Sequence, residues 1–223
     1  FVVTAGLGSG KTHGKAHWGH DRVLKNWQTE FSCFVEPTYQ KIFDAALPKY
    51  KKILQLHGFN QNRDYKVYKS PFPKIIYTGS PRKHEVHFIS GDNPDSIVAV
   101  EYSHAVIDEA GIISGETLDN VQSRIRDTRA TCLQTFMGGA PQGVNDFADR
   151  FDSVQLEGWN TDHWRKHTKT DVIEGVEVST KRYIVWTDDN AHNLPPGYIQ
   201  RNIVAPYGHN QNLIKSYRYG LFC

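Results

Sequence analysis

The sequence predicts an α/β fold in which helices cover both faces of a mostly parallel sheet. Two apolar runs end in polar residues typical of ligand sites: residues 1–4 lead into a glycine-rich loop, and residues 104–107 lead into two adjacent carboxylates. Elsewhere, short apolar runs alternate with stretches whose apolar residues recur at helical spacing. Such alternation is typical of parallel strands joined by crossover helices.

The expected elements follow this alternation in chain order. Strands are expected at residues 1–4, 31–35, 74–78, 85–90, 104–107, 131–137, 159–170 and 176–187, with a short element at 97–100. Helices are expected at residues 12–30, at a stretch from Ile42 to Leu47 that Pro48 interrupts or extends, at 115–129, and at about 198–219. Residues 61–73 are polar and aromatic, so we expect mostly loop there.

The residues after the first strand, 5–12, read AGLGSGKT, which fits a phosphate-binding loop. Its glycines let successive backbone N–H groups surround phosphate oxygens, and the following helix presents its positive end. In this pattern Lys11 reaches the β- and γ-phosphates and Thr12 holds Mg²⁺. The residues expected to bind the nucleotide are therefore Gly6, Leu7, Gly8, Ser9, Gly10, Lys11 and Thr12.

The two carboxylates after residues 104–107 complete the expected nucleotide site. Asp108 is placed to hold the Mg²⁺ shell through water, and Glu109 is placed to polarise the water that attacks the γ-phosphate. A glutamate directly after the metal aspartate favours ATP hydrolysis that drives movement over a slow switch. The chain has no Asn-Lys-x-Asp string of the kind that reads guanine, so ATP is favoured over GTP.

Composition indicates a globular enzyme with a single core. The 223 residues carry a net charge of +2, which permits contact with nucleic acid but does not require it. Cys33, Cys132 and Cys223 lack the spacing of a zinc site or a disulfide framework, so a reducing cytoplasm fits them. No apolar run is long enough to span a bilayer, and no signal peptide precedes the first strand. Because the chain begins inside a strand without Met, we expect it to be a fragment.

A set of strings occurs along the chain in a fixed order: GLGSGKT at 6–12, EPTY at 36–39, FISGDNPDS at 88–96, VIDEAG at 106–111, SRIR at 123–126, GGAPQGVNDFADRF at 138–151, TDDN at 187–190, LPPGYI at 194–199 and YRYGLF at 217–222. This ordered set resembles the ATPase domain of the large terminase subunit, the DNA-packaging motor of tailed bacteriophages. The resemblance covers essentially the whole chain. It implies a P-loop NTPase fold of the RecA-like or ASCE type, with a small C-terminal lid or linker subdomain.

The resemblance also implies cofactors and residue roles. ATP and Mg²⁺ are the implied cofactors, with Lys11 on phosphate, Thr12 and Asp108 on the metal, and Glu109 as the catalytic carboxylate. The coupling motif, which senses the γ-phosphate and transmits hydrolysis to DNA movement, falls on Gly138, Gly139, Ala140 and Pro141. The family often has an arginine in the middle of its phosphate loop, and this chain has Leu7 there.

A missing loop arginine leaves open which residue neutralises charge on the transferring phosphoryl group. Arg124, which points away from the apolar stripe of its expected helix, and Arg126, on the flank, are the candidate catalytic arginines, each facing a neighbouring subunit. The alternative for both is an ordinary solvated surface arginine.

The resemblance divides the chain into an ATPase core at residues 1–154 and a lid or linker subdomain at 155–223, with a nuclease domain expected after residue 223. It implies ATP-driven translocation of double-stranded DNA into a procapsid, without DNA cleavage by this fragment. The implied partners are double-stranded viral DNA, the portal protein, the small terminase subunit and other copies of the chain in a ring. The implied location is the host cytoplasm, transiently at the procapsid and away from membranes.

Two other functions stay open. Residues 37–39, Pro-Thr-Tyr, and the Asp-Glu-Ala string also resemble early helicase motifs, although the chain has no room for a second RecA-like domain. A nucleotide-binding scaffold that no longer hydrolyses ATP is the other alternative, and Glu109 beside Asp108 argues against it.

Two further patterns are interpreted as ordinary surface. His13, His17 and His20 have a spacing that metals use on helices, but no carboxylate or cysteine completes a zinc site. The basic residues that either line a DNA channel or simply face solvent are Lys49, Lys51, Lys52, Arg63, Lys66, Lys69, Arg82 and Lys83.

Overall fold

The computed structural model describes residues 1–79, 83–93, 97, 100–141, 145–151, 160–163 and 165–222. The chain divides into two compact units, which we call the middle unit (Thr12–Phe136) and the terminal unit (Phe1–Lys11 with Met137–Cys223). Strands and helices occur in both units, so the predicted α/β class is confirmed. Within the described ranges, no helix has the length and apolar character needed to cross a membrane.

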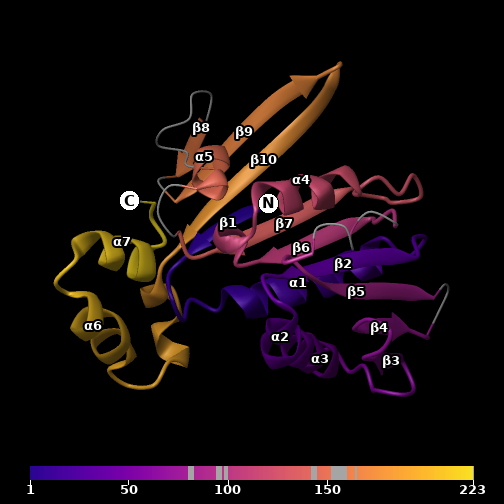
Figure 1. Cartoon of the computed structure of the whole chain (residues 1–223), viewed down its shortest axis with the longest axis horizontal. Coiled ribbons are helices and arrows are strands. Elements are labelled where there is room, and N and C mark those ends of the chain that lie inside the picture. Colours follow the sequence, from indigo (N-terminus) through magenta and orange to yellow (C-terminus); the bar gives the residue numbers. More distant parts are fainter. Residues whose placement is uncertain are drawn as a thin grey trace. The chain divides into compact units, whose positions relative to one another are not determined.

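The middle unit is built on three parallel strands. β2 (Phe31–Glu36) lies between β5 (His84–Ser90) and β6 (His104–Asp108) and pairs with both in parallel. β4 (Lys74–Tyr77) pairs antiparallel with β5, and β3 (Tyr65–Tyr68) pairs antiparallel with β4 (Figure 1). The strands predicted at residues 74–78 and 85–90 are therefore confirmed. Because parallel strands end at the same edge, the last residues of β2 and β6 lie together.

Helix α1 (Lys11–Lys25) packs closely on this sheet through its small residues. A Cβ added at Gly19 would lie 3.1 Å from Val106 on β6 and 3.4 Å from Tyr50. Tyr50 and Phe34, both 1% exposed, meet edge to face with ring centroids 6.3 Å apart. Burial of such rings is a main source of stability in a core of this kind.

The other helices of the middle unit connect its strands. Pro48 lies in the first turn of α3, directly after a π-helix, and the helix continues through it, so Pro48 extends the predicted helical stretch and does not interrupt it. These helices are α2 (Tyr39–Lys41), the π-helix η1 (Ile42–Ala46), α3 (Leu47–Leu56), the 3₁₀ helix η3 (Ala110–Ile112) and α4 (Gly115–Ser123).

The terminal unit is built around β1 (Val2–Ala5). On one side β1 pairs in parallel with β7 (Gln134–Gly139) through Met137–Gly139, and on the other side in parallel with β10 (Val176–Val185). β9 (Lys166–Ile173) pairs antiparallel with β10, and β8 (Asn160–His163) pairs antiparallel with β9. The tail of the chain thus supplies a strand directly beside the strand that begins it.

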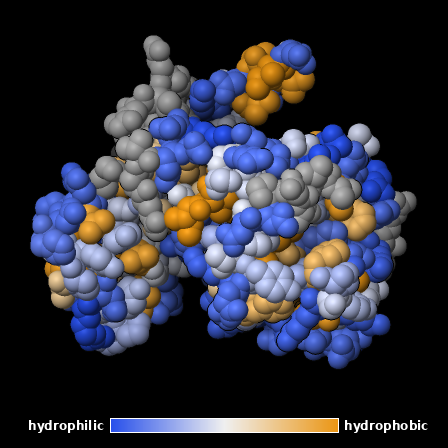
Figure 2. All heavy atoms as spheres, viewed as in Figure 1, coloured by the Kyte–Doolittle hydropathy of each residue, from blue (hydrophilic) through white to orange (hydrophobic). Residues whose placement is uncertain are grey.

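β9 and β10 form a long two-stranded ribbon (Figure 1). Its end is apolar and solvent-exposed, and Figure 2 shows this patch as orange spheres at the end of the ribbon. The exposed residues there are Val172, Ile173, Val176 and Val178.

Helices of the terminal unit follow β7 and β10. They are α5 (Asp146–Phe151), the 3₁₀ helix η4 (Thr187–Asn193), the π-helix η5 (Gln200–Val204), α6 (Ala205–Tyr207) and α7 (Gln211–Tyr219). The single closing helix predicted at about 198–219 is therefore wrong. The break has a local cause, because the Asn210 side chain accepts hydrogen bonds from the N–H groups of Asn212 and Leu213 and starts α7 as a new helix.

Two other predicted helices are shorter in the structure than in the sequence analysis. The helix predicted at 115–129 ends at Ser123, because Arg124 caps it and Ile125 forms an isolated bridge with Tyr102. The helix predicted at 12–30 ends at Lys25 and is followed by a turn. Most of the short element predicted at 97–100, the start of the strand predicted at 159–170 and the predicted boundary between residues 154 and 155 lie outside the described residues.

Candidate functional site

The glycine-rich loop follows β1 in the terminal unit. Gly6 continues the pairing of β1 with β10, since its N–H donates to the carbonyl of Val185 at 3.0 Å. Gly8 and Gly10 have φ angles of 76° and 86°, which residues with a Cβ adopt at a cost. The loop therefore needs glycine at both positions to curl, and α1 begins directly after it at Lys11.

Side chains from the tail fix the carbonyl groups of this loop. The Thr187 hydroxyl donates to the Leu7 carbonyl at 2.7 Å, and the Asn190 amide donates to the Gly8 carbonyl at 2.7 Å. The N–H of Leu7 donates to the Tyr217 carbonyl at 2.6 Å. These bonds hold the loop in its curled form.

The tail also leaves no space beside two of the glycines. A Cβ at Gly6 would lie 2.4 Å from the carbonyl oxygen of Arg218, closer than real Cβ atoms approach backbone. A Cβ at Gly8 would lie 3.0 Å from the ring of Tyr198 and 3.3 Å from Leu194. The LPPGYI string, whose role the sequence left unassigned, thus lies against the glycine-rich loop.

The predicted coupling motif lies at the end of β7, in the terminal unit. Gly138 and Gly139 pair in register with Val3 and Thr4, so the motif is beside the strand that leads into the loop. All four motif residues are buried. The Ser216 hydroxyl of α7 donates to the carbonyl of Pro141, and the next residue of α7 accepts the Leu7 N–H. Two consecutive residues of α7 therefore contact the predicted coupling motif and the glycine-rich loop.

In the middle unit, Asp108 ends β6 and is 2% exposed. Its carboxylate forms a buried ion pair with Lys15 of α1, and it also accepts hydrogen bonds from the Thr12 hydroxyl and the Glu109 N–H. Burial alone would raise the pKa of Asp108, but the Lys15 ammonium and these two donors outweigh burial and hold the pKa below its usual value. Asp108 is therefore an anion at neutral pH.

Glu36 is the second buried carboxyl group at this strand edge. It follows the pair Val35 and Ile107 in the register of β2 and β6, which brings it beside Asp108. Its side chain is 1% exposed, and its Oε1 has no hydrogen-bond partner among the described residues. Burial and then the charge of Asp108 raise the pKa of Glu36 to about 8.

Glu109 has a backbone conformation that non-glycine residues rarely adopt. Its φ is 47° and its ψ is 43°, in the left-handed region, directly before helix η3. Strain of this kind costs on the order of 1 kcal/mol and concentrates at functional positions. It supports the predicted importance of Glu109, while its catalytic role stays a prediction.

The two arginines proposed as catalytic have different surroundings from those predicted, because the helix ends before them. Arg126 forms an ion pair with Glu101 at 3.0 Å, and both side chains are more than half exposed. Arg124 is half-buried at the end of α4, and its Nε has no hydrogen-bond partner in the described part of the chain.

Two of the α1 histidines lie beside a third histidine, His57. His17 Nε2 lies 3.1 Å from Nε2 of His57 at the end of α3, and the buried His20 lies beside the same ring. Across the described ranges, no three metal-ligating side chains are grouped closely enough to hold an ion. Burial first, and then His57, lower the pKa of His20 to about 4, so its ring is neutral at physiological pH.

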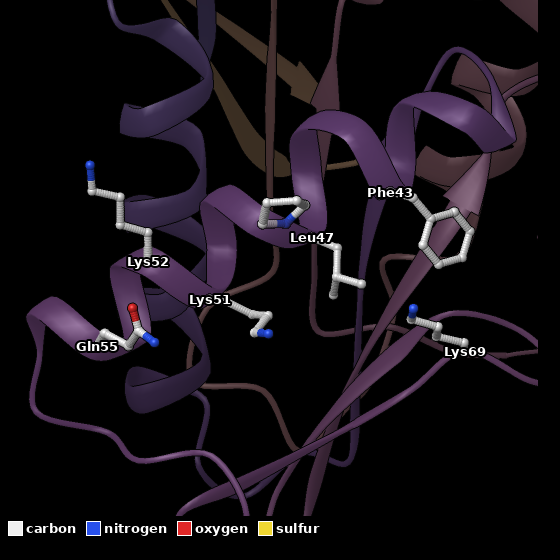
Figure 3. A pocket seen from close by; sticks show the side chains of 7 residues that line it. Phe43, Leu47, Lys51, Lys52, Gln55 and Lys69 are labelled. Atoms are coloured by element: carbon white, nitrogen blue, oxygen red, sulfur yellow. The ribbon is translucent and has the colours of Figure 1, made fainter.

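Some of the predicted basic residues line a shallow groove of about 550 Å³ on the middle unit, formed by η1 and α3 with Lys69. Figure 3 shows Lys51 and Lys69 on the same side as the Leu47 and Phe43 side chains, whereas Lys52 points away. Lys69 also lies 6.0 Å from the ring centre of Phe43. Arg63 and Lys83, by contrast, pair with carboxylates, and Arg82 lies outside the described residues.

Sequence reasoning missed several residues of these sites. In the terminal unit they are Thr187, Asn190 and Tyr198, which lie in the TDDN and LPPGYI strings, to which the sequence assigns no role. In the middle unit they are Lys15 and Glu36. A lysine at a position that faces the sheet in the α1 pattern was the available signal for the first of these.

The fold of the chain is similar to that of several solved structures. The large terminase of a thermophilic bacteriophage matches with a TM-score of 0.66 at 12% identity, over 99% of this chain and 48% of that chain. The same terminase in complex with ADP matches with a TM-score of 0.62 at 13% identity, over 90% of this chain and 43% of that one. A mutant of the large terminase ATPase domain of Thermus phage P74-26 matches with a TM-score of 0.60 at 16% identity, over 100% of this chain and 88% of that chain.

The Phi-28 gp11 DNA packaging motor matches with a TM-score of 0.51 at 14% identity, over 99% of this chain and 64% of that chain. No protein-family model and no curated protein matches the chain. The chain spans about half the length of the terminase from the thermophilic bacteriophage, at 48%. At these identities the likeness concerns the fold alone, and the fold is the α/β fold of large terminase ATPase domains.

Proposed function

We propose that the chain is the ATPase part of a DNA-packaging motor, with ATP bound by residues 6–12. The observation that carries the proposal is the hydrogen bond from the Thr12 hydroxyl to Asp108, because it joins the end of the phosphate loop to the acidic end of β6. The fold shared with large terminase ATPase domains supports the proposal, and one of those proteins has been solved with ADP.

The donor atoms fit Mg²⁺, the cofactor that accompanies ATP. The Thr12 hydroxyl and the Asp108 carboxylate are hard oxygen ligands, and Asp108 is anionic because its pKa is held low. When bound, Mg²⁺ supplies positive charge to the phosphate oxygens. Thr12 and Asp108 orient that charge, directly or through water, and Lys11 adds its own to the phosphates.

Glu109 is proposed as the residue that orients and polarises the attacking water. Its left-handed backbone directs its side chain differently from a residue that continues the strand. The Glu109 N–H donates to the Asp108 carboxylate at 2.9 Å, which fixes the backbone of Glu109 relative to that carboxylate. Either Arg124 or Arg126 of a neighbouring copy would neutralise the developing charge.

We also propose that ATP hydrolysis drives the movement of double-stranded DNA. The basic groove, here defined as the surface of Phe43, Leu47, Lys51 and Lys69, fits phosphate groups, since no carboxylate of the described residues pairs with either lysine. Replacing Lys51 and Lys69 together by Gln is expected to weaken DNA binding and flatten its salt dependence, while ATP affinity is unchanged. Unchanged DNA affinity would remove the groove from the proposal.

Partners and location follow from the same proposal. The full subunit would carry its nuclease after residue 223 and assemble as a ring on the procapsid portal in the host cytoplasm, with the small subunit selecting DNA. The chain alone is then expected to hydrolyse ATP and to leave DNA uncut. A helicase domain and a non-hydrolysing scaffold remain the competing proposals.

A single substitution separates the motor from the scaffold. Glu109→Gln is expected to lower ATP turnover by about a thousandfold, because the attacking water loses its base, while ADP affinity is retained. Glu116→Gln, at an exposed position on α4, is the matched control and should turn over normally. Equal turnover in the Glu109→Gln and wild-type chains would contradict the proposal.

A further inference from the structure

The middle unit holds a fully buried lysine for which the proposed function has no use. Lys15 is 0% exposed and its ammonium lies on a carboxylate oxygen of Asp108, which is 2% exposed. A lysine is almost never buried completely unless its charge is matched. The ammonium therefore occupies the carboxylate that the proposed function assigns to Mg²⁺.

Glu36 supplies a second acceptor in the same place. It ends β2 beside the end of β6, and its buried Oε1 lacks a hydrogen-bond partner among the described residues. Lys15 lies on Asp108, and Glu36 ends the neighbouring strand at the matching register position, so the two carboxyl groups and the ammonium belong to one strand edge. A buried acceptor without a donor is costly, which makes Glu36 a ready partner for a displaced ammonium.

An ammonium on one oxygen of a buried carboxylate opposes the binding of a divalent cation to that oxygen. Their repulsion at ion-pair distance is strong even at the effective dielectric of protein surfaces, about 20. For Asp108 to hold Mg²⁺ directly at that oxygen, Lys15 has to leave it. Lys15 lies on the second turn of α1, so a change of side-chain rotamer is enough to redirect its ammonium.

Resting on the proposed function, we infer that Lys15 is the built-in counter-ion of the metal site. Its ammonium holds Asp108 while the site lacks a metal ion, and it transfers to Glu36 when Mg²⁺ arrives. Loss of the Lys15–Asp108 ion pair disfavours binding of Mg²⁺ alone. When Mg²⁺ arrives with a triphosphate, the further ligands of the triphosphate compensate for that loss. Lys15 and Glu36 are thus positioning residues that make the site accept Mg²⁺ together with the nucleotide.

The test measures binding of Mn²⁺ without nucleotide, by electron paramagnetic resonance, on the whole chain. Lys15→Met keeps the length of the side chain and removes its charge. This variant is expected to bind Mn²⁺ at least about tenfold more tightly than the wild type, because no ammonium competes for Asp108. Lys25→Met, at an exposed lysine of the same helix, should bind like the wild type. The Lys15→Met chain should also melt at a lower temperature and regain its stability when Mn²⁺ is added.

Glu36→Gln gives a second measurement with the opposite sign. The ammonium then has no second carboxyl group to move to, so binding of Mn²⁺ together with a non-hydrolysable ATP analogue should weaken, by about tenfold. This variant keeps Lys15 paired, so it stays informative if Lys15→Met does not fold.

The outcomes separate this inference from the function on which it rests. If Asp108→Asn weakens Mn²⁺-nucleotide binding while Lys15→Met binds Mn²⁺ no better than Lys25→Met, the counter-ion inference is wrong and the proposed function stands. If Glu36→Gln binds as tightly as the wild type, the transfer to Glu36 is wrong. If Asp108→Asn leaves Mn²⁺-nucleotide binding unchanged, the metal role of Asp108 fails and both proposals fall.

Discussion

Two parts of the proposed site are stabilised in different ways. One is the phosphate loop of the terminal unit, and the other is the carboxylate cluster of the middle unit, formed by Asp108, Glu36 and Lys15. Uncharged groups hold the loop: Thr187 and Asn190 donate to its carbonyls, and a backbone carbonyl of α7 accepts from Leu7. Buried charges hold the cluster, where Lys15 pairs with Asp108. Neutral hydrogen bonds fix the conformation of the loop. A buried ion pair instead keeps two opposite charges matched, and a metal ion that binds the carboxylate has to replace the ammonium.

This difference indicates which part of the site is ready for ligand. The loop keeps its curl through contacts that a bound phosphate would leave in place, so it is preorganised. The cluster has to exchange one cation for another before it can act. Ligand binding is therefore expected to leave the loop much as it is and to rearrange the side chains around Asp108.

The largest effect is expected from filling the space beside the loop. Gly6→Ala would bring a Cβ within 2.4–2.7 Å of two backbone carbonyls of α7, so α7 or the loop has to shift. We expect a loss of about 2–3 kcal/mol in the free energy of unfolding, and at least tenfold weaker ADP binding, measured by denaturation and calorimetry.

Gly14→Ala is the matched control for this change. Gly14 lies on α1 with nothing within 4 Å of an added Cβ, so alanine should stabilise the chain by about 1 kcal/mol through helix propensity. If Gly6→Ala behaved like Gly14→Ala, the loop would not be fixed by its contacts with the tail.

The next effect concerns pH and the buried histidines of the middle unit. Burial lowers the pKa of His84 to about 4, and its ring lies between the Ser32 hydroxyl at 2.9 Å and the Thr29 carbonyl at 3.1 Å. Its pKa is lower in the folded than in the unfolded chain, so the unfolded chain binds more protons between pH 6.5 and 4. Stability is therefore full above pH 6.5 and is lost as the pH falls through this range.

At pH 5 this loss amounts to about 2 kcal/mol for His84 alone. Urea denaturation at pH 7 and pH 5 measures it, and His84→Gln should reduce the difference by about that amount. His209→Gln, at an exposed position of the terminal unit, should keep the wild-type difference. An identical pH dependence in the His84→Gln and wild-type chains would show that His84 is not held neutral.

The smallest effect is expected from one of the neutral bonds to the loop. Asn190→Ala removes the donor to the Gly8 carbonyl and should weaken ADP binding about fivefold, equivalent to about 1 kcal/mol. Binding of Mn²⁺ alone should not change, because Asn190 belongs to the loop and not to the cluster. Gln211→Ala, exposed on α7, is the control, and a loss of ADP binding as large in that variant would contradict the specific role of Asn190.

Local patterns in the sequence predicted the parts of the site that depend on neighbouring residues. The string at residues 6–12 predicted a curled loop before a helix, and the apolar run before Asp108 predicted a strand end, because both depend on nearby backbone geometry. Helix ends were predicted less well. The helix expected to reach residue 129 stops at Ser123, where a long-range bridge between Ile125 and Tyr102 replaces the next turn.

The contacts that define the site could not be predicted, because they join residues distant in sequence. Pairing of β10 with β1 brings Thr187 to Leu7 across 180 positions, and Lys15 meets Asp108 across 93 positions. Glu36 is part of the EPTY string, but its burial depends on the order of β2 and β6 in the sheet. Strand order is a property of the whole fold, so no local pattern reveals it.

The most direct test of the account is a crystal structure of the chain with Mg²⁺ and a non-hydrolysable ATP analogue. The account predicts the triphosphate on residues 6–12, the metal ion at Thr12 and Asp108, and the Lys15 ammonium on Glu36. A nucleotide bound away from this loop, or a metal ion that Asp108 does not hold directly or through water, would contradict it.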